Sequence, residues 1–512
     1  MEVNVAPLFL TLFFFIIFFL LKLIRTRFTT KNSTVARLPP GPWKLPFIGN
    51  LHQLIGSLPH RVLGDLAKKY GPIMHIQMGE ISSIVFSSPE AVKEVMKTHD
   101  LNFASRPRFE ALAAVTYDCS NMGFAPYGEY WKQLRKVCTT ELFSARRVQS
   151  FRDLREEEST NSVKWIAGNE GSPVNFTEKI HSFTYGTISR AAFGKKRAEQ
   201  ETVISLVKEI IRLAEAFNVA DLYPSLKFLH SVTGIKAKME SAHKELDRMF
   251  DNMINERRTE RRTKDGENKL EDQKDLLDVL LMYHEQENLG FSPTIANIKG
   301  MIVDVFTAGT ETTSGTVDWA MAEMMKNPEI MKKAQEEVRQ VFGPKGYVDE
   351  GDFDKLRYMK SVIKETLRVH PPLPLLLPRL NQERCVINGY EIPANTHITV
   401  NAWAVNRDPS YWKDAESFQP ERFLEENSSI DYKSSLNFDF IPFGGGRRVC
   451  AGMHLGVANM ELPLAKFLYH FDWVLPNGMK SEELDMTEGP GFTLRRQQDL
   501  YLVPSLKYPL IH

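Results

Sequence analysis

Apolar residues along this chain recur mostly with the spacing of α-helices. Positions repeating every three or four residues dominate Leu276–Tyr283 and Ile295–Met325, and such spacing places apolar side chains on one helical face. Shorter runs in which apolar and polar residues alternate, as in half-buried strands, occupy Ile73–Met78, Ser83–Ser87 and His397–Val400. No repeat or second linker interrupts the main part of the chain. The pattern therefore predicts one large, mainly α-helical domain with a small β-sheet region.

The amino-terminal segment departs from this pattern. Val3–Leu21 has no charged residue and contains six phenylalanines, and as a helix it would rise about 28 Å, close to the thickness of a bilayer's hydrocarbon core. Lys22 and Arg25 follow, whereas Glu2 precedes, which orients the rest of the chain towards the cytosol. A cleaved signal peptide would need a basic start and a small-residue cleavage site, and this segment has neither. We therefore predict a transmembrane anchor at residues 1–24.

Two further segments bear on how the main domain sits on a lipid surface. Residues 25–50 are basic and then proline-rich, and four prolines between Leu38 and Pro46 forbid a helix and favour an extended hinge. A proline-rich ligand for a partner domain is the alternative, which a neighbouring anchor disfavours. Phe217–Leu229 mixes apolar residues with a proline break, so it is either a connection between helices or a second membrane contact. Residues 51–512 form the main domain.

Composition narrows the function without identifying it. Lys plus Arg and Asp plus Glu both number 64, so global charge gives no reason to expect a nucleic-acid partner. The four cysteines, Cys119, Cys138, Cys385 and Cys450, have neither the spacing of zinc sites nor that of a secreted disulfide framework. We therefore expect the main domain in a reducing compartment such as the cytosol.

Cys450 lies in a sequence that calls for a chemical explanation, Phe443–Gly452 (FGGGRRVCAG). A lone cysteine is usually a small buried hydrophobic residue. Here three glycines allow the backbone to approach a flat ligand closely, and backbone N–H groups in such a turn can point at a thiolate sulfur. Arg448 can meet an anionic group. The dipole of the apolar helix Leu455–Leu468, which Gly452 opens, also stabilises a thiolate.

A second unusual sequence lies in the middle of the predicted long helix, which Ser292 would cap, with Pro293 in the first turn, and Asn327-Pro328 would end. Its centre, Ala308–Thr313 (AGTETT), contains glycine, which costs about 1 kcal/mol in a helix interior. It also places hydroxyls and a carboxyl in an apolar stretch. Back-bonding of the threonine hydroxyls, with a modest bend, explains this sequence structurally. A local opening for oxygen and water explains it functionally.

Together the two sequences resemble those of the cytochrome P-450 family, the haem-thiolate monooxygenases. Phe443, Gly446, Arg448, Cys450 and Gly452 match the family's haem-binding signature F-x-x-G-x-R-x-C-x-G. The resemblance implies the mainly α cytochrome P-450 fold with a small β-sheet region. It also implies haem b (iron protoporphyrin IX) as cofactor, with Cys450 as the axial ligand of the iron.

The AGTETT sequence is similar to the family's distal-side stretch A-G-x-[DE]-T-[TS]. The resemblance implies that Glu311 and Thr312, beside Gly309, deliver protons for the cleavage of O2, and a carboxyl next to a hydroxyl forms a suitable short relay. Glu365–Arg368 looks like the family's E-x-x-R motif and Arg422 like its third charged partner. This implies a structural role behind the cysteine loop, although an isolated i,i+3 ion pair is unspecific.

The resemblance also assigns residues to the remaining pocket. Trp131 and Arg135, one helical turn apart, are similar to the family's W-x-x-x-R pair and should bind a haem propionate, as should Arg448. Arg106 and Arg379 are similar in position to further propionate ligands. Apolar residues that should form the walls for a hydrocarbon-rich substrate are Leu112, Ile302, Val305, Phe306, Ala308, Leu373, Leu377 and Phe492.

By this resemblance, the chain oxidises a hydrophobic small molecule with O2 and with electrons that NADPH-cytochrome P-450 reductase delivers. Sequences such as Asp65–Pro72 and Phe438–Gly452 are closest to microsomal plant members that oxidise sesquiterpenes, diterpenes or terpenoid alkaloids, whereas Ala451 departs from a common proline. The implied location is the endoplasmic reticulum membrane, single-pass, with the catalytic domain in the cytosol. Basic residues that could dock the reductase, or belong to an ordinary solvated face, are Lys132, Arg135, Lys136, Arg146, Arg147 and Arg447.

Three alternatives differ in chemistry or in class. Oxidation of an alkaloid or a fatty acid would use the same reaction. A haem-thiolate isomerase or dehydratase is expected to lack the acid–alcohol pair, which Glu311 and Thr312 supply here. A non-catalytic haem carrier or gas sensor would need neither the long helix with its weak centre nor an apolar distal wall.

Overall fold

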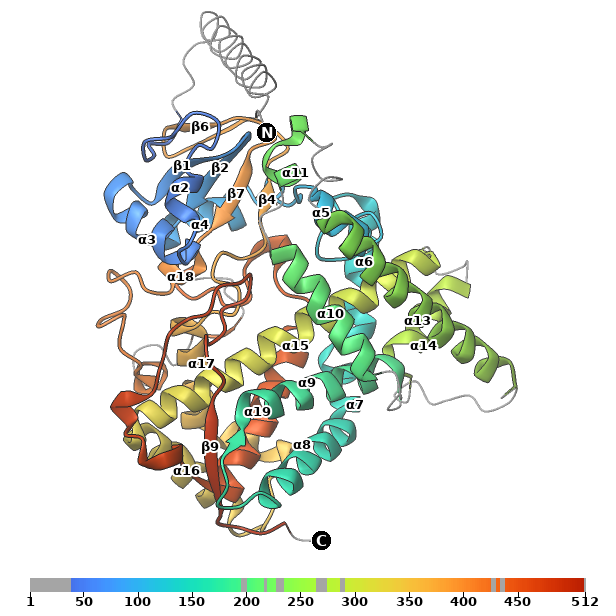
Figure 1. Ribbon diagram of the computed structural model, residues 1–512, viewed down its shortest axis with the longest axis vertical. Coiled ribbons are helices and arrows are strands. Elements are labelled where there is room, and N and C mark those ends of the chain that lie inside the picture. Colours follow the sequence, from blue (N-terminus) through green and yellow to red (C-terminus); the bar gives the residue numbers. More distant parts are fainter. Residues whose placement is uncertain are drawn as a thin grey trace, which may run out of the picture.

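The strands of the largest sheet gather at one end of the molecule, whereas β9 (Tyr501–Leu506) lies among helices towards the other end (Figure 1). The computed structural model describes residues 38–194, 200–215, 219–226, 234–263, 274–285, 291–424, 430–432 and 438–510. Within them the chain is mainly helical with small sheets, as the apolar pattern predicts.

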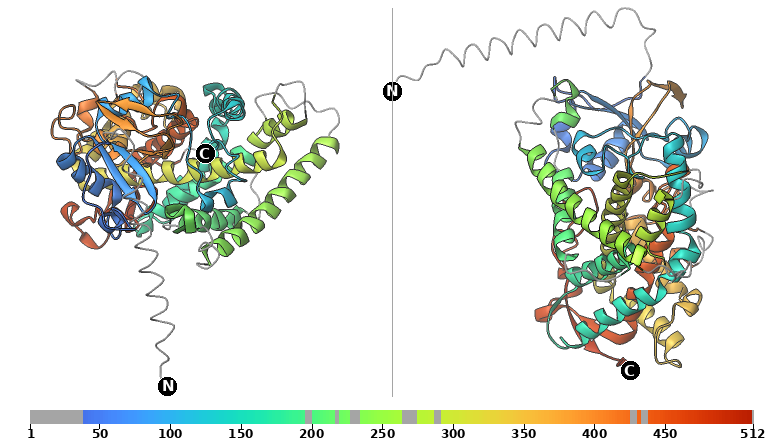
Figure 2. Two further views of the ribbon diagram at one scale, coloured as in Figure 1. Left: turned by 90° about the horizontal axis from the view of Figure 1, so that it is seen from above. Right: turned by 90° about the vertical axis from the view of Figure 1, so that its right-hand side faces the viewer.

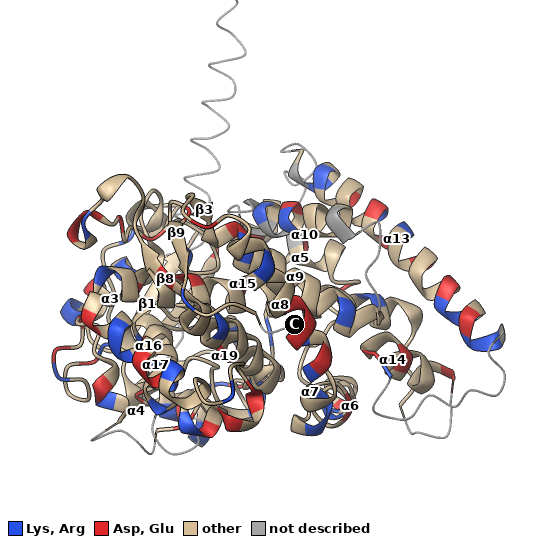
Figure 3. Ribbon diagram, turned by 90° about the horizontal axis from the view of Figure 1, so that it is seen from below, with Lys and Arg blue, Asp and Glu red and all other residues tan. Residues whose placement is uncertain are grey.

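One long helix, α15 (Ile295–Lys326), crosses the helical part and organises it (Figure 1). It packs most extensively on α9 (Phe176–Phe193) and also on α19 (Met453–His470) and α17 (Arg357–Val369). The other helices of at least nine residues are α3 (Pro59–Tyr70), α6 (Glu129–Val137), α8 (Arg152–Ala167), α10 (Gln200–Glu215), α13 (Ile235–Thr263), α14 (Leu276–Glu285) and α16 (Pro328–Phe342). Helices α13 and α14 extend along one flank (Figure 2), and α13 carries interspersed charges of both signs (Figure 3).

The start of α15 differs from the prediction. Thr294, not Ser292, is the N-cap: its hydroxyl accepts from the Asn297 N–H, and the Asn297 side chain accepts from the Thr294 N–H. This reciprocal cap needs a polar residue three positions after the cap. Ser292 has Ile295 at that position and cannot form it, so Pro293 precedes the helix.

The largest sheet has four strands in the order β1 (Ile73–Met78), β2 (Ile81–Phe86), β7 (His397–Val400) and β4 (Arg379–Leu380). Strands β1 and β7 have the predicted bounds. Strand β2 begins two residues before its predicted start, because the hairpin pairs Met78 with Ile81. The smaller sheets join β3 (Val174–Asn175), β9 (Tyr501–Leu506) and β8 (Phe471–Val474), and β5 (Cys385–Ile387) and β6 (Tyr390–Ile392).

The predicted anchor, residues 1–24, and the first part of the hinge lie outside the described residues. Among the described residues, no helix has the length and apolar character needed to cross a bilayer. The hinge from Leu38 to Trp43 is not helical, and the Pro40 carbonyl accepts from the His75 N–H of β1 at 2.9 Å. The described part of Phe217–Leu229 includes α11 (Val219–Leu222), which meets the β1–β2 turn where the Glu80 N–H donates to the Leu222 carbonyl.

Candidate active site

An internal cavity of about 390 Å³ separates the centre of α15 from the cysteine loop. Cys450 borders it on one side, and Ala308, Gly309, Glu311 and Thr312 border it on the other. Its walls are mostly apolar, which suits a hydrophobic ligand. The fold therefore brings together the two sequences that stand out in the linear chain.

The cysteine loop is held against the segment 94–100. A Cβ on Gly446 would lie 2.5 Å from the Met96 carbonyl oxygen, so this position requires glycine, and one on Gly445 would lie 2.9 Å from Met96 Sδ. Gly446 also has a positive φ of 64°. These two glycines thus allow a close approach between chain segments, and the expected approach of the loop to a flat ligand stays a prediction.

Cys450 is accessible although protein atoms surround it, because the residue borders the cavity and a second hollow of about 530 Å³ on the other side of the loop. Its backbone N–H donates to the Phe443 carbonyl at 3.0 Å. Burial raises the pKa of the Cys450 thiol, while the Gly452 N–H and the Arg135 charge act in the opposite direction. The sulfur therefore borders the cavity with one backbone donor and one nearby cation that favour its thiolate form, the form that would bind a metal.

Four arginines border the same cavity: Arg106, Arg135, Arg379 and Arg448. Burial, reinforced by the neighbouring arginines, lowers the pKa of Arg448 to about 9 and that of Arg106 well below its ordinary value. Asp100 pairs with Arg379 at 3.3 Å and only partly offsets this charge. A buried cluster of cations favours an anionic ligand. A flat group with two carboxylates beside an accessible sulfur, such as haem, fits this set of donors.

In this structure the cationic donors bond backbone carbonyls. Arg448 and the Trp131 indole both donate to the Met122 carbonyl, at 3.2 and 3.1 Å, and Arg106 Nε donates to the Gly123 carbonyl at 3.1 Å. The same segment is held from α15, where Asp304 accepts from the Gly123 N–H at 3.0 Å and from the Asn121 amide. Segment 121–123 thus bridges the arginine cluster and the long helix.

The centre of α15 remains helical. The Thr312 hydroxyl donates to the Ala308 carbonyl at 2.6 Å and the Thr310 hydroxyl to the Phe306 carbonyl, so the back-bonding alternative is observed. A Cβ on Gly309 would lie 2.9 Å from Ile188 Cδ1, so glycine allows α9 to approach closely. These contacts account for the weak helix formers structurally, and they leave the side chains of Glu311 and Thr312 at the cavity wall.

Most of the predicted wall residues line the cavity. Ile302 and Phe306 are the exceptions: both are buried in the core beside α9, where the Phe306 ring lies 5.8 Å from the Phe193 ring. They form one row with Thr310, because residues four apart share a helical face, and this row points away from the cavity. The predicted residues that do line it are Leu112, Val305, Ala308, Leu373, Leu377 and Phe492.

Several lining residues were not predicted. Met301 and Asp304 lie seven and four positions before Ala308, so helical phase could have identified them. Burial raises the pKa of Asp304 to about 6, although the Gly123 N–H and the Asn121 amide oppose this. Phe143 and Ile188 come from other elements, and no local sequence signal marks them.

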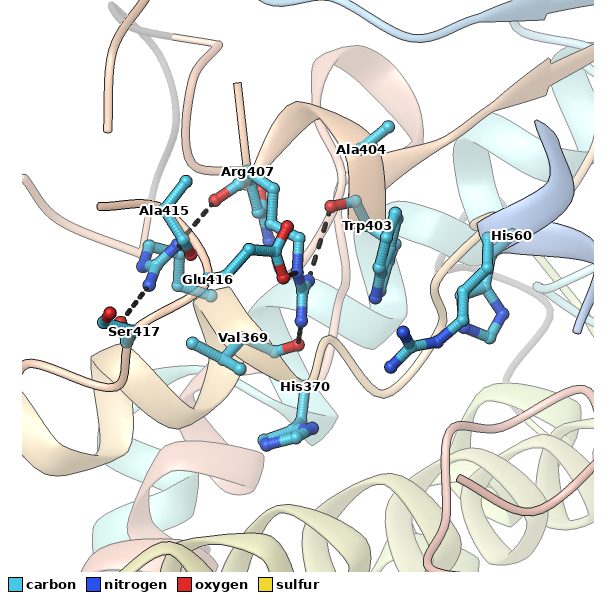
Figure 4. Close-up of polar contacts among 12 residues, drawn as sticks. His60, Val369, His370, Trp403, Ala404, Arg407, Ala415, Glu416 and Ser417 are labelled. Carbon is cyan, nitrogen blue, oxygen red and sulfur yellow. Dashed lines mark hydrogen bonds and ion pairs between the residues drawn. The ribbon is translucent and has the colours of Figure 1, made fainter. Parts of the chain in front are cut away.

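The charged scaffold residues are brought together beside Asn406, whose side-chain oxygen accepts from the Ile441 N–H just before the cysteine loop. Arg368 donates to both oxygens of Glu365, at 2.7 and 2.8 Å, and Arg422 donates to Glu365 Oε1 at 3.0 Å. Glu365 and Arg368 are 0% exposed, unlike an ordinary surface pair. Arg407, which was not predicted, lies beside them; its guanidinium stacks 4.3 Å from the Trp403 ring and donates to the Val369 carbonyl (Figure 4).

Comparisons with known proteins agree with this geometry. The family model described as "Cytochrome P450" matches residues 39–503. The chain is 49% identical over 510 residues to salviol synthase from Salvia pomifera, covering 100% of this chain and 99% of the relative. It is 50% identical over 483 residues to premnaspirodiene oxygenase from Hyoscyamus muticus, covering 94% and 95%. A zebra fish cytochrome P450 structure with progesterone shares the fold, with a TM-score of 0.75 and 22% identity over 88% of this chain and 100% of that one.

Proposed function

Because this chain belongs to the cytochrome P450 family and is a haem b-dependent monooxygenase, we propose that its substrate is a sesqui- or diterpenoid. The reaction inserts one oxygen atom of O2 by hydroxylation, epoxidation or further oxidation at carbon. The cavity between Cys450 and α15 carries this proposal, since its mostly apolar walls suit a hydrocarbon skeleton. The name of the premnaspirodiene oxygenase relative also favours it.

The residues that would hold haem line the side of the cavity to which Cys450 belongs. Cys450 would ligate the iron, and Phe443, Gly446 and Gly452 shape its loop. When bound, haem supplies the redox centre at which O2 is activated, and a thiolate ligand favours O–O cleavage. The propionates would be held by N–H donors that border the cavity: the guanidinium groups of Arg106, Arg135, Arg379 and Arg448 and the neutral indole of Trp131.

The distal wall would control protons and water. Glu311 presents a carboxyl to the cavity and Thr312 a hydroxyl, so the pair can pass protons inward while the apolar walls exclude bulk water. Gly309 contributes by letting α9 approach α15. This wall therefore does not need to bind the substrate through polar groups, and it orients a hydrocarbon by shape.

NADPH-cytochrome P-450 reductase is the proposed electron donor, and it would dock on the side of the second hollow. Lys132, Lys136, Arg146 and Arg447 are exposed basic residues, and an acidic partner would meet their charge. Lys132 and Arg447 already pair with Glu129 and Asp100 in the folded chain. Arg147 is not suited to this role, because it is buried and donates to the Glu141 and Lys274 carbonyls.

The proposed location is the endoplasmic reticulum membrane, with residues 1–24 as a single-pass anchor. Large apolar side chains are exposed in the hinge and in the segment that follows it, including Trp43 and Ile55. Tyr223, beside α11, donates to the Phe47 carbonyl of the same segment. A chain without residues 1–30 should bind membranes less tightly and keep the haem spectrum; a lost spectrum would show that this segment belongs to the fold.

The proposed reaction is tested in microsomes that contain the full chain and the reductase. Sesquiterpene and diterpene hydrocarbons are offered with NADPH and isotope-labelled O2, and products are analysed by mass spectrometry. One labelled oxygen atom per product supports the proposal. Turnover only of alkaloids or fatty acids would overturn the terpenoid assignment, and product formed without NADPH and O2 would indicate the isomerase or dehydratase alternative.

A further inference from the structure

Two side chains of α9 lie over Glu311. His181 and Tyr185 are one helical turn apart and therefore share a face. The Tyr185 hydroxyl donates to Glu311 Oε1 at 3.0 Å, and His181 Nδ1 lies 3.8 Å from the same oxygen. Their reach depends on the close approach of α9 to α15, which the glycine at position 309 permits.

His181 connects this contact to the outside of the protein. Its side chain is 20% exposed, whereas that of Glu311 is 13% exposed and borders the cavity. His181 Nδ1 is also 3.1 Å from the Ser314 hydroxyl. The charged groups that face the imidazole are Glu311 of α15, Lys208 of α10, and Arg495 and Asp499 of the C-terminal segment. His181 is thus a partly exposed polar side chain beside Glu311, which itself borders the cavity.

We infer that His181 relays protons from solvent to the Glu311 carboxylate and that Tyr185 holds this carboxylate in position. The inference rests on the proposed function, in which Glu311 passes protons into the cavity. The proton on His181 Nδ1 moves to Glu311 Oε1, and Nε2 takes up a proton from solvent. Glu311 then gives its proton to the cavity and returns to the carboxylate. The imidazole then returns to its Nδ1–H tautomer by proton exchange with solvent, so each cycle carries one proton inward and moves no electrons.

The surroundings suit both assignments. Burial lowers the pKa of His181, with Lys208 and Arg495 acting in the same direction and Glu311 and Asp499 opposing. The imidazole therefore stays neutral near pH 7, with one N–H donor and one acceptor nitrogen, as a relay requires. Burial raises the pKa of Tyr185, so its hydroxyl remains a neutral donor that fixes the carboxylate but does not carry the proton.

The test compares His181→Gln and Tyr185→Phe with Thr187→Val as a matched control. The Thr187 hydroxyl is buried on the same helix and donates to the Phe183 carbonyl. Each haem-loaded enzyme is assayed with reductase, NADPH and substrate. The His181 variant should convert NADPH to product about tenfold less efficiently and release the difference as hydrogen peroxide, because proton supply limits its turnover. This loss should increase with pH.

Two further measurements separate a relay from a merely structural contact. Turnover driven by iodosylbenzene, a donor of a single oxygen atom that needs no delivered protons, should remain at the wild-type rate in all three variants. The infrared band of the Glu311 carboxyl, identified through Glu311→Gln, should shift in the Tyr185 variant and change its pH dependence in the His181 variant. The control should show neither change.

Wild-type coupling in both α9 variants, or an unmoved Glu311 band in both, overturns the inference. The Tyr185 variant keeps the test decisive if the His181 variant does not fold. Failure of the proposed function has a different signature: wild-type enzyme would then show no NADPH-dependent oxygenation. The infrared titration, which needs no turnover, would still decide whether the α9 residues control the Glu311 proton.

Discussion

The two sides of the proposed haem site differ in the side chains that build them: one is a buried network of charged residues and the other is a mostly apolar wall. Near the cysteine loop, Glu365, Arg368 and Arg422 form a buried network in which the Arg368 guanidinium contacts both oxygens of one carboxylate. On the distal side, the cavity wall is mostly apolar, and Glu311 is held by a single tyrosine hydroxyl bond and a nearby histidine. A paired buried charge fixes geometry, because any displacement leaves a desolvated ion. An apolar wall can change shape at a smaller cost, so it suits recognition of varied substrates.

The largest effect on activity is expected from substitution of Cys450, the proposed iron ligand. Cys450→Ser should abolish the red-shifted Soret band of the reduced carbonyl form, and monooxygenation should fall below detection, because a hydroxyl does not replace a thiolate ligand. The measurement is the carbon monoxide difference spectrum. Cys385→Ser is the matched control, since Cys385 lies in β5, and should keep the band. Survival of the band in the Cys450 variant would place the iron ligand elsewhere.

The scaffold should respond next. Arg368→Ala leaves Glu365 buried without its main partner, so the free energy of unfolding should fall by about 3–5 kcal/mol. Chemical denaturation of the haem-loaded protein measures this change. Lys333→Ala removes an exposed ion pair with Glu421 and should alter stability by less than about 0.5 kcal/mol. Equal losses in the two variants would contradict the contrast between a rigid scaffold and an ordinary surface.

Asp304, which connects α15 to segment 121–123, should make the free energy of unfolding depend on pH. Burial raises the pKa of Asp304 to about 6, whereas an unfolded aspartate titrates near 3.9. The folded state therefore binds this proton more tightly, and the stability from this source is present below pH about 4 and lost as pH rises through 6. The loss is about 2–3 kcal/mol.

Asp304→Asn should remove this component of the pH dependence. The measurement is the free energy of unfolding of both proteins from pH 4 to 7, and only their difference is interpreted. A constant difference across this range would show that Asp304 does not titrate there.

The smallest effect concerns the efficiency of oxygen use. Thr312→Ala should lower product formed per NADPH about tenfold, because proton delivery would lose its hydroxyl while the apolar wall stays intact. Product and hydrogen peroxide are quantified together. Thr316→Val, which removes a hydroxyl that donates to the Thr312 carbonyl one turn further along α15, should couple like the wild type. Unchanged coupling in the Thr312 variant would exclude that hydroxyl from proton delivery.

Local sequence predicted the scaffold of the site better than its walls. The cysteine loop and the centre of α15 are continuous in sequence, so their unusual compositions were visible before any fold was known. The sequence did not show which face of α15 borders the cavity, because apolar residues occur on several of its faces. Ile302 and Phe306 were therefore assigned to the cavity although they face α9. The contacts of Glu311 with His181 and Tyr185 join residues about 130 positions apart, which no spacing rule reveals.

The bridge at segment 121–123 has a consequence for how selectivity develops. Its carbonyls accept from Arg448 and Arg106, two of the proposed propionate ligands, and its Gly123 N–H donates to Asp304. Asn121, Met122 and Gly123 also line the cavity, so a shift of these arginines would move part of the wall that contacts the substrate. We therefore expect substitutions at Asp304 to change which substrates the enzyme accepts as well as how firmly the arginines are held.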